Sequence, residues 1–198
     1  MESIRLNATH GKQLTSMEKK RHAQNLYKMK VDPERIINIL SISQDTFYKA
    51  TADIRKEEKT DRDVKILQMY LSCYTEEEIA REVGMDQSGV HRAIESIMKN
   101  SEIIKSHNES PSSLQITTLW SFDACDPSYG EKGYPGRMPG QIVENLLWYY
   151  TEPFDLVLDI FAGSGTTIDV SKKMYRRYLG FDLNPNETKG IKFWITSE

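Results

Sequence analysis

A stretch rich in glycine and threonine near the end of the chain, LDIFAGSGTTIDV over residues 158–170, has the composition of a ligand-binding turn. The apolar residues 154–160 are predicted to form a strand before it, and residues 166–175 a helix after it. Gly163 and Gly165 permit positive φ angles and lack the Cβ atoms that would keep a ligand away from the backbone. The free N–H groups at the start of the helix would face that ligand.

A second strand is predicted over residues 179–182, and it ends in Asp182. An acid at the tip of the second strand of a strand–helix–strand unit typically accepts hydrogen bonds from ribose hydroxyls. Asp182 is therefore a candidate for holding a nucleoside. The alternative is a turn acid at a strand end without a ligand.

Three classes of ligand could bind a glycine turn of this kind. A nucleoside triphosphate requires a lysine after the last glycine, and this chain has Thr166 there, so we reject a P-loop. A dinucleotide favours a third glycine three residues after Gly165, where the chain has Ile168. S-adenosylmethionine (SAM) carries no phosphate and needs neither residue, so the pattern favours SAM.

The D-x-F-x-G-x-G-T-T pattern of residues 159–167 resembles the SAM-binding motif of the N4-cytosine/N6-adenine DNA methylase family. The preceding block, YPGRMPGQIVENLLWYYTEPFDLVLDIFAGSGTT over residues 134–167, resembles the family block of two proline pairs, a helix (here 141–150) and a strand. The resemblance spans residues 120–185. It implies transfer of a methyl group from SAM to an exocyclic amine of adenine or cytosine in DNA.

The resemblance also implies roles for individual residues. Asp159 would fix the loop or accept from the SAM ammonium, and Thr166 and Thr167 would cap the helix and contact the SAM carboxylate. Met138 replaces the usual lysine, and Arg137 is the nearest cation that could take over its contact. The implied cofactor-binding residues are Asp159, Phe161, Ala162, Gly163, Ser164, Gly165, Thr166, Thr167, Asp182 and Arg137.

The catalytic residues of that family lie in a [DNS]-P-P-[YFW] loop, which receives a flipped base. The nearest match is Asp126-Pro127-Ser128-Tyr129, in which serine replaces the second proline. Asp126, Pro127 and Tyr129 are the candidate catalytic residues. The alternative is a plain turn, since the segment lies only a few residues before the block at 134–167.

The helical first half contains two similar units that suggest helix-turn-helix DNA binding. In the later one, over residues 75–98, Thr75 and Glu78 form a capping-box pattern, Gly84 ends a short helix and Asp86 can cap the next. A plain helical hairpin is the alternative. The candidate DNA contacts of this unit are Gln87, Ser88, His91 and Arg92.

The earlier unit covers residues 16–50 and is predicted to contain three helices, the last one capped by Ser43. With the residues before it, this unit resembles the segment that precedes the helix-turn-helix of ParB-like partition and phage proteins. Residues 5–30 carry seven Lys/Arg and one acid, a patch that can contact phosphates or form a solvated face. The candidate DNA contacts here are Gln44, Thr46 and Lys49.

Composition limits the remaining choices. The chain has 198 residues, a net charge of −3 and two cysteines without metal-ligand spacing, so neither a disulfide framework nor a metal site is predicted. No apolar run is long enough to span a membrane, and a cytoplasmic location is the default expectation.

The predicted fold is α plus α/β: a helical helix-turn-helix region over residues 1–105 (units at about 15–50 and 62–100), a linker at 106–115, and a partial Rossmann-like SAM-methyltransferase domain at 116–198. Few strands fit after Asp182, so the chain is expected to be an incomplete DNA methyltransferase, and a second chain could complete its sheet. The partners expected are SAM and double-stranded DNA. The alternative function is a DNA-binding regulatory protein with a vestigial SAM site.

Overall fold

The computed structural model describes residues 14–100, 102–103, 105, 109–112, 114–117, 119–122, 124–184 and 190–193. Arg5 and Lys12 of the predicted basic patch lie outside these residues. Internal contacts divide the chain into two units, residues 1–62 and 63–198. The division runs through a long helix, α5 (Ala52–Leu71), and a linker function for residues 106–115 stays a prediction.

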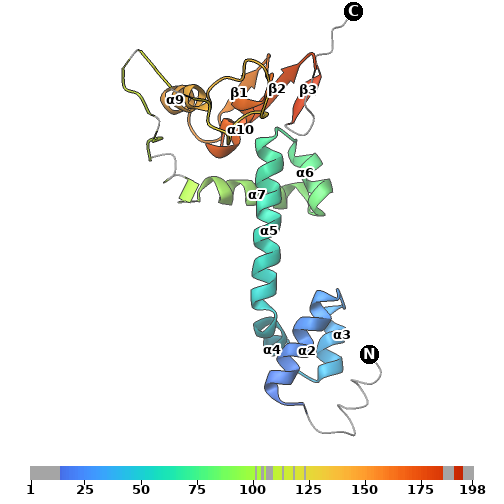
Figure 1. The fold of residues 1–198 in the computed structure, drawn as a ribbon. Helices are drawn as coiled ribbons and strands as arrows, with labels where there is room; N and C mark the ends of the chain where they lie inside the picture. Colours follow the sequence, from blue (N-terminus) through green and yellow to red (C-terminus); the bar gives the residue numbers. More distant parts are fainter. Residues whose placement is uncertain are drawn as a thin grey trace, which may run out of the picture. The chain divides into compact units, whose positions relative to one another are not determined.

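The first unit contains α2 (Ser16–Lys28), α3 (Pro33–Leu40) and α4 (Gln44–Ala50), followed by the beginning of α5 (Figure 1). The three predicted helices are confirmed, and so is the cap, because the Ser43 side chain accepts from Thr46 N. Apolar faces of the three helices meet in one core. Its buried residues are Ala23, Leu26, Ile36, Leu40, Phe47 and Ala50.

The helical part of the second unit contains the end of α5, then α6 (Glu76–Val83) and α7 (Gln87–Met98). The capping box of Thr75 and Glu78 is confirmed, and Gly84 ends α6 with a φ of 66°. Asp86 is the N-cap residue of α7, but its side chain makes no cap hydrogen bond to the helix backbone. The Ser88 hydroxyl donates to that carboxylate instead, so the predicted side-chain cap is wrong.

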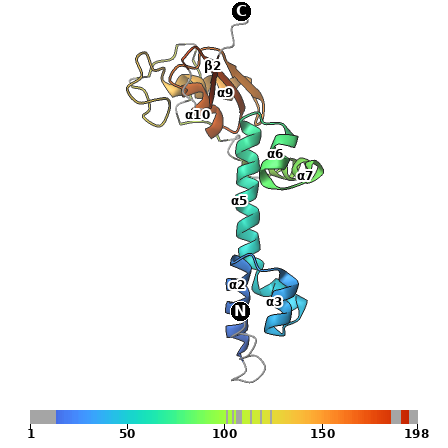
Figure 2. The ribbon, with the colours of Figure 1, turned by 90° about the vertical axis from the view of Figure 1, so that its right-hand side faces the viewer.

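The α/β part follows in the order α9 (Gly140–Tyr150), β1 (Leu156–Asp159), α10 (Thr166–Lys173), β2 (Arg177–Asp182) and β3 (Ile191–Phe193). The strands form a parallel sheet in the order β1-β2-β3 (Figure 1), with Leu158 opposite Leu179. The turned view in Figure 2 shows α10 beside β2. Each helix and strand predicted here from the sequence is present with slightly different ends. The expected α/β class of this part is confirmed.

Packing in the α/β part brings α10 against β1, β2 and α9. The absence of a side chain at Gly180 in β2 makes this possible, because a Cβ there would lie 2.5 Å from Ile168 Cδ1. In β1, Leu156 and Leu158 stay more than half exposed. Among the residues that the structure describes, β1 pairs only with β2, and no helix has the length and apolar character needed to cross a membrane.

Candidate functional site

The glycine loop lies between the end of β1 and the start of α10. Phe161 N donates to Asp159 Oδ1 (3.0 Å), and Ala162 N donates to the carbonyl of Phe181 on β2 (2.9 Å). Gly163 and Gly165 have φ angles of 48° and 77°, which side-chain-bearing residues rarely adopt. The loop therefore starts from a fixed strand end and turns sharply back over the sheet.

Asp182, at the end of β2, reaches this loop. Its Oδ2 accepts from Gly163 N (2.8 Å) and its Oδ1 accepts from Asn184 N (3.0 Å). The hydrogen bonds from Asn184 and then Gly163 lower the pKa of Asp182, so its carboxylate stays charged. Half-buried and ionised, Asp182 can hold the loop and still accept from a ligand.

The start of α10 is not capped by the two threonines, Thr166 and Thr167, that were expected to cap it. Gly165 occupies the N-cap position and no side chain caps the helix, so the predicted capping by Thr166 and Thr167 is wrong. Thr166 is buried, shares a hydrogen bond with the Ser164 hydroxyl (2.9 Å) and donates to the Met138 carbonyl (3.4 Å). The first N–H groups of α10 are thus left without a side-chain cap.

Aromatic side chains accompany the loop. Phe161 is 79% exposed, and a Cβ on Gly163 would lie 3.4 Å from the hydroxyl of Tyr134. The sequence pointed to Tyr134 only as part of a family block. The fold brings its ring to the surface of the loop, where it can contact a ligand.

The candidate catalytic segment is folded as a turn. Tyr129 N donates to the Asp126 carbonyl (3.3 Å), and Asp126 Oδ1 accepts from Ser128 N (2.8 Å). Hydrogen bonds from the Ser128 hydroxyl and backbone lower the pKa of Asp126. Pro127 is exposed and Asp126 half-buried, which leaves the carboxylate within reach of solvent.

Tyr129 is buried (4% exposed), with its hydroxyl donating to Glu144 Oε1 on α9 (2.5 Å). Lys173 on α10 donates to the same carboxylate oxygen (2.7 Å) and to the tyrosine hydroxyl. The Tyr129 ring also packs closely on Gly140, where a Cβ would clash with it. In this position the ring is a core residue and has no free face on which a base could stack.

Hydrogen bonds and charges within the cluster of Tyr129, Glu144 and Lys173 shift the pKa values of its members. Burial alone would lower the pKa of Lys173, but its hydrogen bonds to Glu144 and Tyr129 outweigh burial and raise that pKa. Burial, and then the hydrogen bond to Glu144, raises the pKa of Tyr129. The lysine thus stays charged opposite the buried Glu144 carboxylate, and the phenol stays neutral.

The segment after Tyr129 lies directly on the glycine loop. Glu131 N donates to the Ser164 carbonyl (2.8 Å), and Gly130 N donates to Asp169 Oδ2 on α10 (2.8 Å). Arg137 donates to the carbonyls of Tyr129 (3.2 Å) and Cys125 (3.5 Å). The predicted catalytic segment, Arg137 and the glycine loop therefore form one connected structure.

Sequence reasoning assigned no site role to Glu144, Lys173 or Asp169. A signal was available for Glu144, which interrupts the apolar face of α9 between Val143 and Leu147. Asp169 and Lys173 are four residues apart and so lie on one face of α10. Nothing in the sequence identified Gly130 and Tyr129 as their partners.

The family comparison agrees with this geometry. The profile of the DNA methylase family (N6_N4_Mtase) matches residues 30–193. The chain belongs to the DNA methylase family.

Individual relatives match shorter parts of this chain. The Type II methyltransferase M.PvuII of Proteus hauseri is 41% identical over 64 residues, which are 32% of this chain and 19% of that protein. The Type II methyltransferase M1.MboII of Moraxella bovis is 46% identical over 55 residues, 28% of this chain and 21% of that protein. The Type II methyltransferase M2.LlaDCHI of Lactococcus lactis subsp. cremoris is 32% identical over 94 residues, 47% of this chain and 34% of that protein.

The matched segments thus cover between about a fifth and a third of the length of these curated relatives. No solved structure matches the chain.

In the helical part of the second unit, the four candidate DNA contacts of the later helix-turn-helix unit line one open hollow of about 570 Å³ together with Glu76. His91 Nδ1 lies 2.9 Å from Glu76 Oε1, and this hydrogen bond and the charge of Glu76 raise the pKa of His91. Arg92 Nε donates to the Ser88 carbonyl (3.2 Å). These residues are gathered as predicted, but an acid lies among them.

The three candidates of the earlier unit, Gln44, Thr46 and Lys49, are exposed on α4. Lys49 forms an ion pair with Asp45 (2.8 Å), and the hydroxyls of Thr46 and Ser43 share a hydrogen bond. Lys19 on α2 donates to the Ser41 carbonyl (3.4 Å), which places a cation at the turn before α4. This surface carries more positive charge than the hollow on α7.

Proposed function

We propose that the chain binds SAM on the β1–α10 loop and takes part in methyl transfer to an exocyclic amine of adenine or cytosine in DNA. Membership of the DNA methylase family supports this proposal, as do three relatives that are named Type II methyltransferases. The observation that carries it is the pairing of Asp182 with Gly163 at the carboxyl ends of two parallel strands. Ligands of open α/β sheets bind at this edge.

The residues of the loop suit the parts of SAM. The uncapped N–H groups of α10 and the guanidinium of Arg137 would take the carboxylate, and Asp159 would accept from the ammonium. Asp182 would accept from the ribose hydroxyls. Phe161 and Tyr134 supply exposed rings for the apolar face of the adenine. When bound, SAM would supply an activated methyl group.

We assign the Asp126 turn only one of the two roles in methyl transfer that the family pattern implies. Asp126 can accept a hydrogen bond from the target amine, because its carboxylate stays ionised and accessible. We assign base stacking to no residue of this turn, because Tyr129 is buried. Tyr129 instead positions the turn through Glu144 and Lys173.

A second candidate function is a DNA-binding protein with a vestigial SAM site. The burial of Tyr129 favours this function, since Tyr129 occupies the position of the family aromatic that stacks on the base and is not exposed. The two functions differ in whether the loop binds SAM with useful affinity.

Calorimetric titration of SAM into the purified chain tests the proposal. We expect saturable binding that Asp182→Ala weakens at least tenfold. Asp155→Ala is the matched control, because Asp155 precedes the opposite end of β1 and its side chain accepts from Glu152 N, away from the glycine loop. Absence of binding by folded wild-type protein, or equal effects of the two variants, would contradict the proposed cofactor site.

A further inference from the structure

The two helical units share an unusual set of turn conformations at a constant offset of 43 residues. Lys30 and Cys73, which both lie before an α-helix of eight residues, have φ angles of 59° and 60°. Ser41 and Gly84, which both end that helix, have φ angles of 47° and 66°. Left-handed residues are rare, so two matching pairs at one offset indicate a repeated structure.

The hydrogen bonds around these turns repeat as well. In the first unit they are Lys30 N to Tyr27 O (2.9 Å), Val31 N to Leu26 O (3.1 Å) and Ile42 N to Ile37 O (3.2 Å). Their counterparts 43 residues later are Cys73 N to Tyr70 O (3.0 Å), Tyr74 N to Met69 O (3.1 Å) and Met85 N to Ala80 O (3.0 Å).

The cores follow the same correspondence. Three pairs of fully buried residues occupy equivalent positions: Ala23 and Ile66, Ile36 and Ile79, Phe47 and Val90. Residues 20–51, the first copy, and residues 63–94, the second copy, are therefore two versions of one three-helix module. Only five of the 32 aligned positions carry the same residue. The repeat is therefore evident from the turn conformations and the core positions and not from sequence identity.

The copies differ most in charge. The first copy has six Lys/Arg and three Asp/Glu, a net charge of +3, whereas the second has three Lys/Arg and six Asp/Glu, a net charge of −3. Individual positions show the reversal: Lys20 corresponds to Asp63, and Arg35 to Glu78. A duplex attracts cations and repels acids along its whole backbone, so the first copy is the better match.

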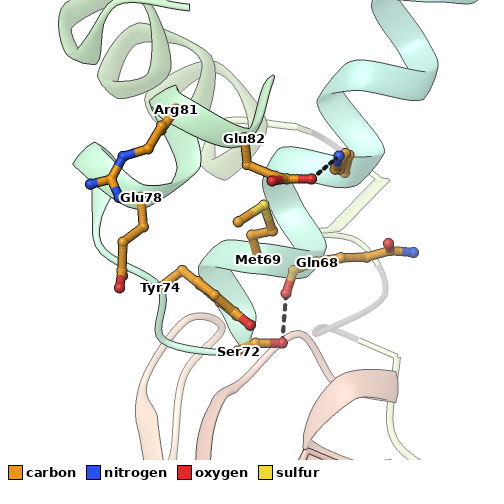
Figure 3. Close-up of a pocket in the computed structure, with 8 residues that line it drawn as sticks. Gln68, Met69, Ser72, Tyr74, Glu78, Arg81 and Glu82 are labelled. Carbon is orange, nitrogen blue, oxygen red and sulfur yellow. Dashed lines mark hydrogen bonds and ion pairs between the residues drawn. The ribbon is translucent and has the colours of Figure 1, made fainter. Parts of the chain in front are cut away.

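The second copy also uses its cations internally. Lys65 forms an ion pair with Glu82 (2.7 Å) at an open groove of about 460 Å³ lined by residues of α5 and α6, and Arg81 lies 3.8 Å from Glu77. Figure 3 shows Glu78 and Glu82 at the same groove as Arg81. Little positive charge remains there for a phosphate.

A different surface of the second copy is occupied by the sheet. The Ser72 hydroxyl shares a hydrogen bond with Tyr178 on β2 (2.5 Å), and Cys73 Sγ donates to the Tyr178 carbonyl (3.4 Å). Leu71 is buried in the cluster that contains Tyr178 and Ile168. The second copy therefore holds the helical part on the α/β part.

The corresponding positions of the first copy are Lys28, Met29 and Lys30, and all three are exposed. Two of them are cations where the second copy has Leu71 and Cys73. This surface of the first copy is therefore exposed and carries two cations, of which Lys30 pairs with Glu58 (2.7 Å), whereas its counterpart is apolar and covered.

We propose that the two copies have divided their roles: the first copy binds the phosphate backbone of double-stranded DNA, and the second anchors the module to the cofactor-binding sheet. The choice of DNA as partner rests on the proposed function. In helix-turn-helix docking the first helix of the pair crosses the DNA backbone. Arg35 on α3 suits this position, whereas α6 has Glu78 there, beside Glu76 and Glu77. The assignment places the main DNA contact on the earlier unit.

Fluorescence anisotropy of a labelled DNA duplex, titrated with the full chain at several salt concentrations, tests this division. Lys49 and Arg92 are equivalent positions that both carry a cation, which makes Lys49→Ala and Arg92→Ala a matched pair. We expect Lys49→Ala to weaken binding about fivefold and to reduce the slope of log affinity against log salt by about 0.9. Arg92→Ala should have less than a third of that effect.

A double variant strengthens the comparison. Lys20→Ala with Arg21→Ala should reduce the salt slope by about 1.8, because two phosphate contacts are lost. Glu76→Gln with Glu77→Gln should leave the affinity within twofold, because the second copy lies away from the duplex. An Arg92→Ala effect equal to or larger than that of Lys49→Ala would overturn the proposal, and so would a strong gain from the glutamine pair.

The outcomes separate this proposal from the proposed function. A chain that binds SAM but no DNA would overturn the division of roles and leave the cofactor site intact. A chain that binds DNA through Lys49 but takes up no SAM would support the division and contradict the cofactor site. Circular dichroism of every variant checks that the helices are retained.

Discussion

At the scale of single residues, Asp182 and Lys173 have the clearest chemical roles. Both are charged groups whose charge is secured by named partners: backbone N–H groups for Asp182, and Glu144 with Tyr129 for Lys173. Asp182 lies at the proposed ligand edge, and Lys173 lies on α10 beside the buried Glu144 and Tyr129. They can therefore be tested separately.

The lowered pKa of Asp182 predicts how SAM binding depends on pH. A carboxylate with a lowered pKa makes its contribution above its ordinary range and loses it as pH falls through the lowered value. We expect SAM affinity to stay level down to the ordinary aspartate pKa of about 3.9 and to decline only below it. Titrations across pH, with Asp182→Asn as the uncharged control, measure this, and a decline centred above that value contradicts the role of Asp182.

Substitutions in the cluster of Tyr129, Glu144 and Lys173 should lower the free energy of unfolding by different amounts. Tyr129→Phe removes two hydrogen bonds, one to Glu144 and one from Lys173, but leaves the ion pair between those residues. We therefore expect a loss of about 1 kcal/mol in the free energy of unfolding. Lys173→Met leaves the Glu144 carboxylate buried without its cation, and we expect a loss of about 2 kcal/mol, below the usual range because Lys173 is partly exposed. Chemical denaturation of each variant provides the values.

The double variant Lys173→Met with Glu144→Gln is the control for that comparison, since it removes the buried negative charge as well. It should regain part of the loss. A double variant that is less stable than Lys173→Met alone would show that the buried charge was not the cause.

At the scale of elements, the repeated module explains why a serine adopts a left-handed conformation at the end of α3. The equivalent residue at the end of α6 is glycine, for which this conformation carries no penalty from a Cβ atom. In the first copy the Ser41 N–H still donates to the Asn38 carbonyl, so the turn is kept in spite of the side chain. The two copies thus have different residues, serine and glycine, at the same left-handed position.

Exchanging these residue types should shift stability in opposite directions. Ser41→Gly relieves the left-handed penalty, and we expect a gain of up to about 1 kcal/mol in the free energy of unfolding. Gly84→Ala introduces the penalty and should cost about 1 to 2 kcal/mol. Thermal and chemical unfolding measure both, and a destabilising Ser41→Gly would indicate that the serine side chain makes a contribution of its own.

At the scale of the whole molecule, the two units are expected to respond differently to the cofactor. The proposed SAM site lies entirely in the second unit, whose sheet, loop and α10 form one core. The first unit has its own core of six buried residues. SAM binding should therefore stabilise the second unit directly and leave the first unit unchanged.

Hydrogen exchange with and without SAM tests this expectation. At 100 times the dissociation constant, SAM should stabilise the unit that binds it by about 2.7 kcal/mol. We expect slower exchange at the amides of Gly163 and Gly165 and across β1 and β2, with no change in α2 to α4. Protection that appears equally in α2 to α4 would contradict separate responses. Whether a further chain pairs with β1 stays a prediction from the sequence.

Local patterns in the sequence determined most elements of this protein. The alternation of apolar residues, the capping box at Thr75 and the glycine at Gly84 are sufficient to predict α6, α7 and the strands, because each depends on residues close in sequence. The glycine loop and Asp182 could be predicted as a cofactor site for the same reason. Prediction was less accurate at the ends of elements, as at Asp86 and Thr166, where a neighbouring polar group competes for the cap.

Only the tertiary structure decided which distant residues meet. It buries Tyr129 between α9 and α10, joins it to Glu144 and Lys173, and sets Gly130 on Asp169. These contacts link positions far apart in the chain, and their energies come from burial and charge pairing that a local pattern does not encode. The same holds for the two copies of the helical module, which share turns and core positions while their surfaces have diverged. A surface residue contributes little to the fold, so its charge can reverse while the backbone beneath it stays the same.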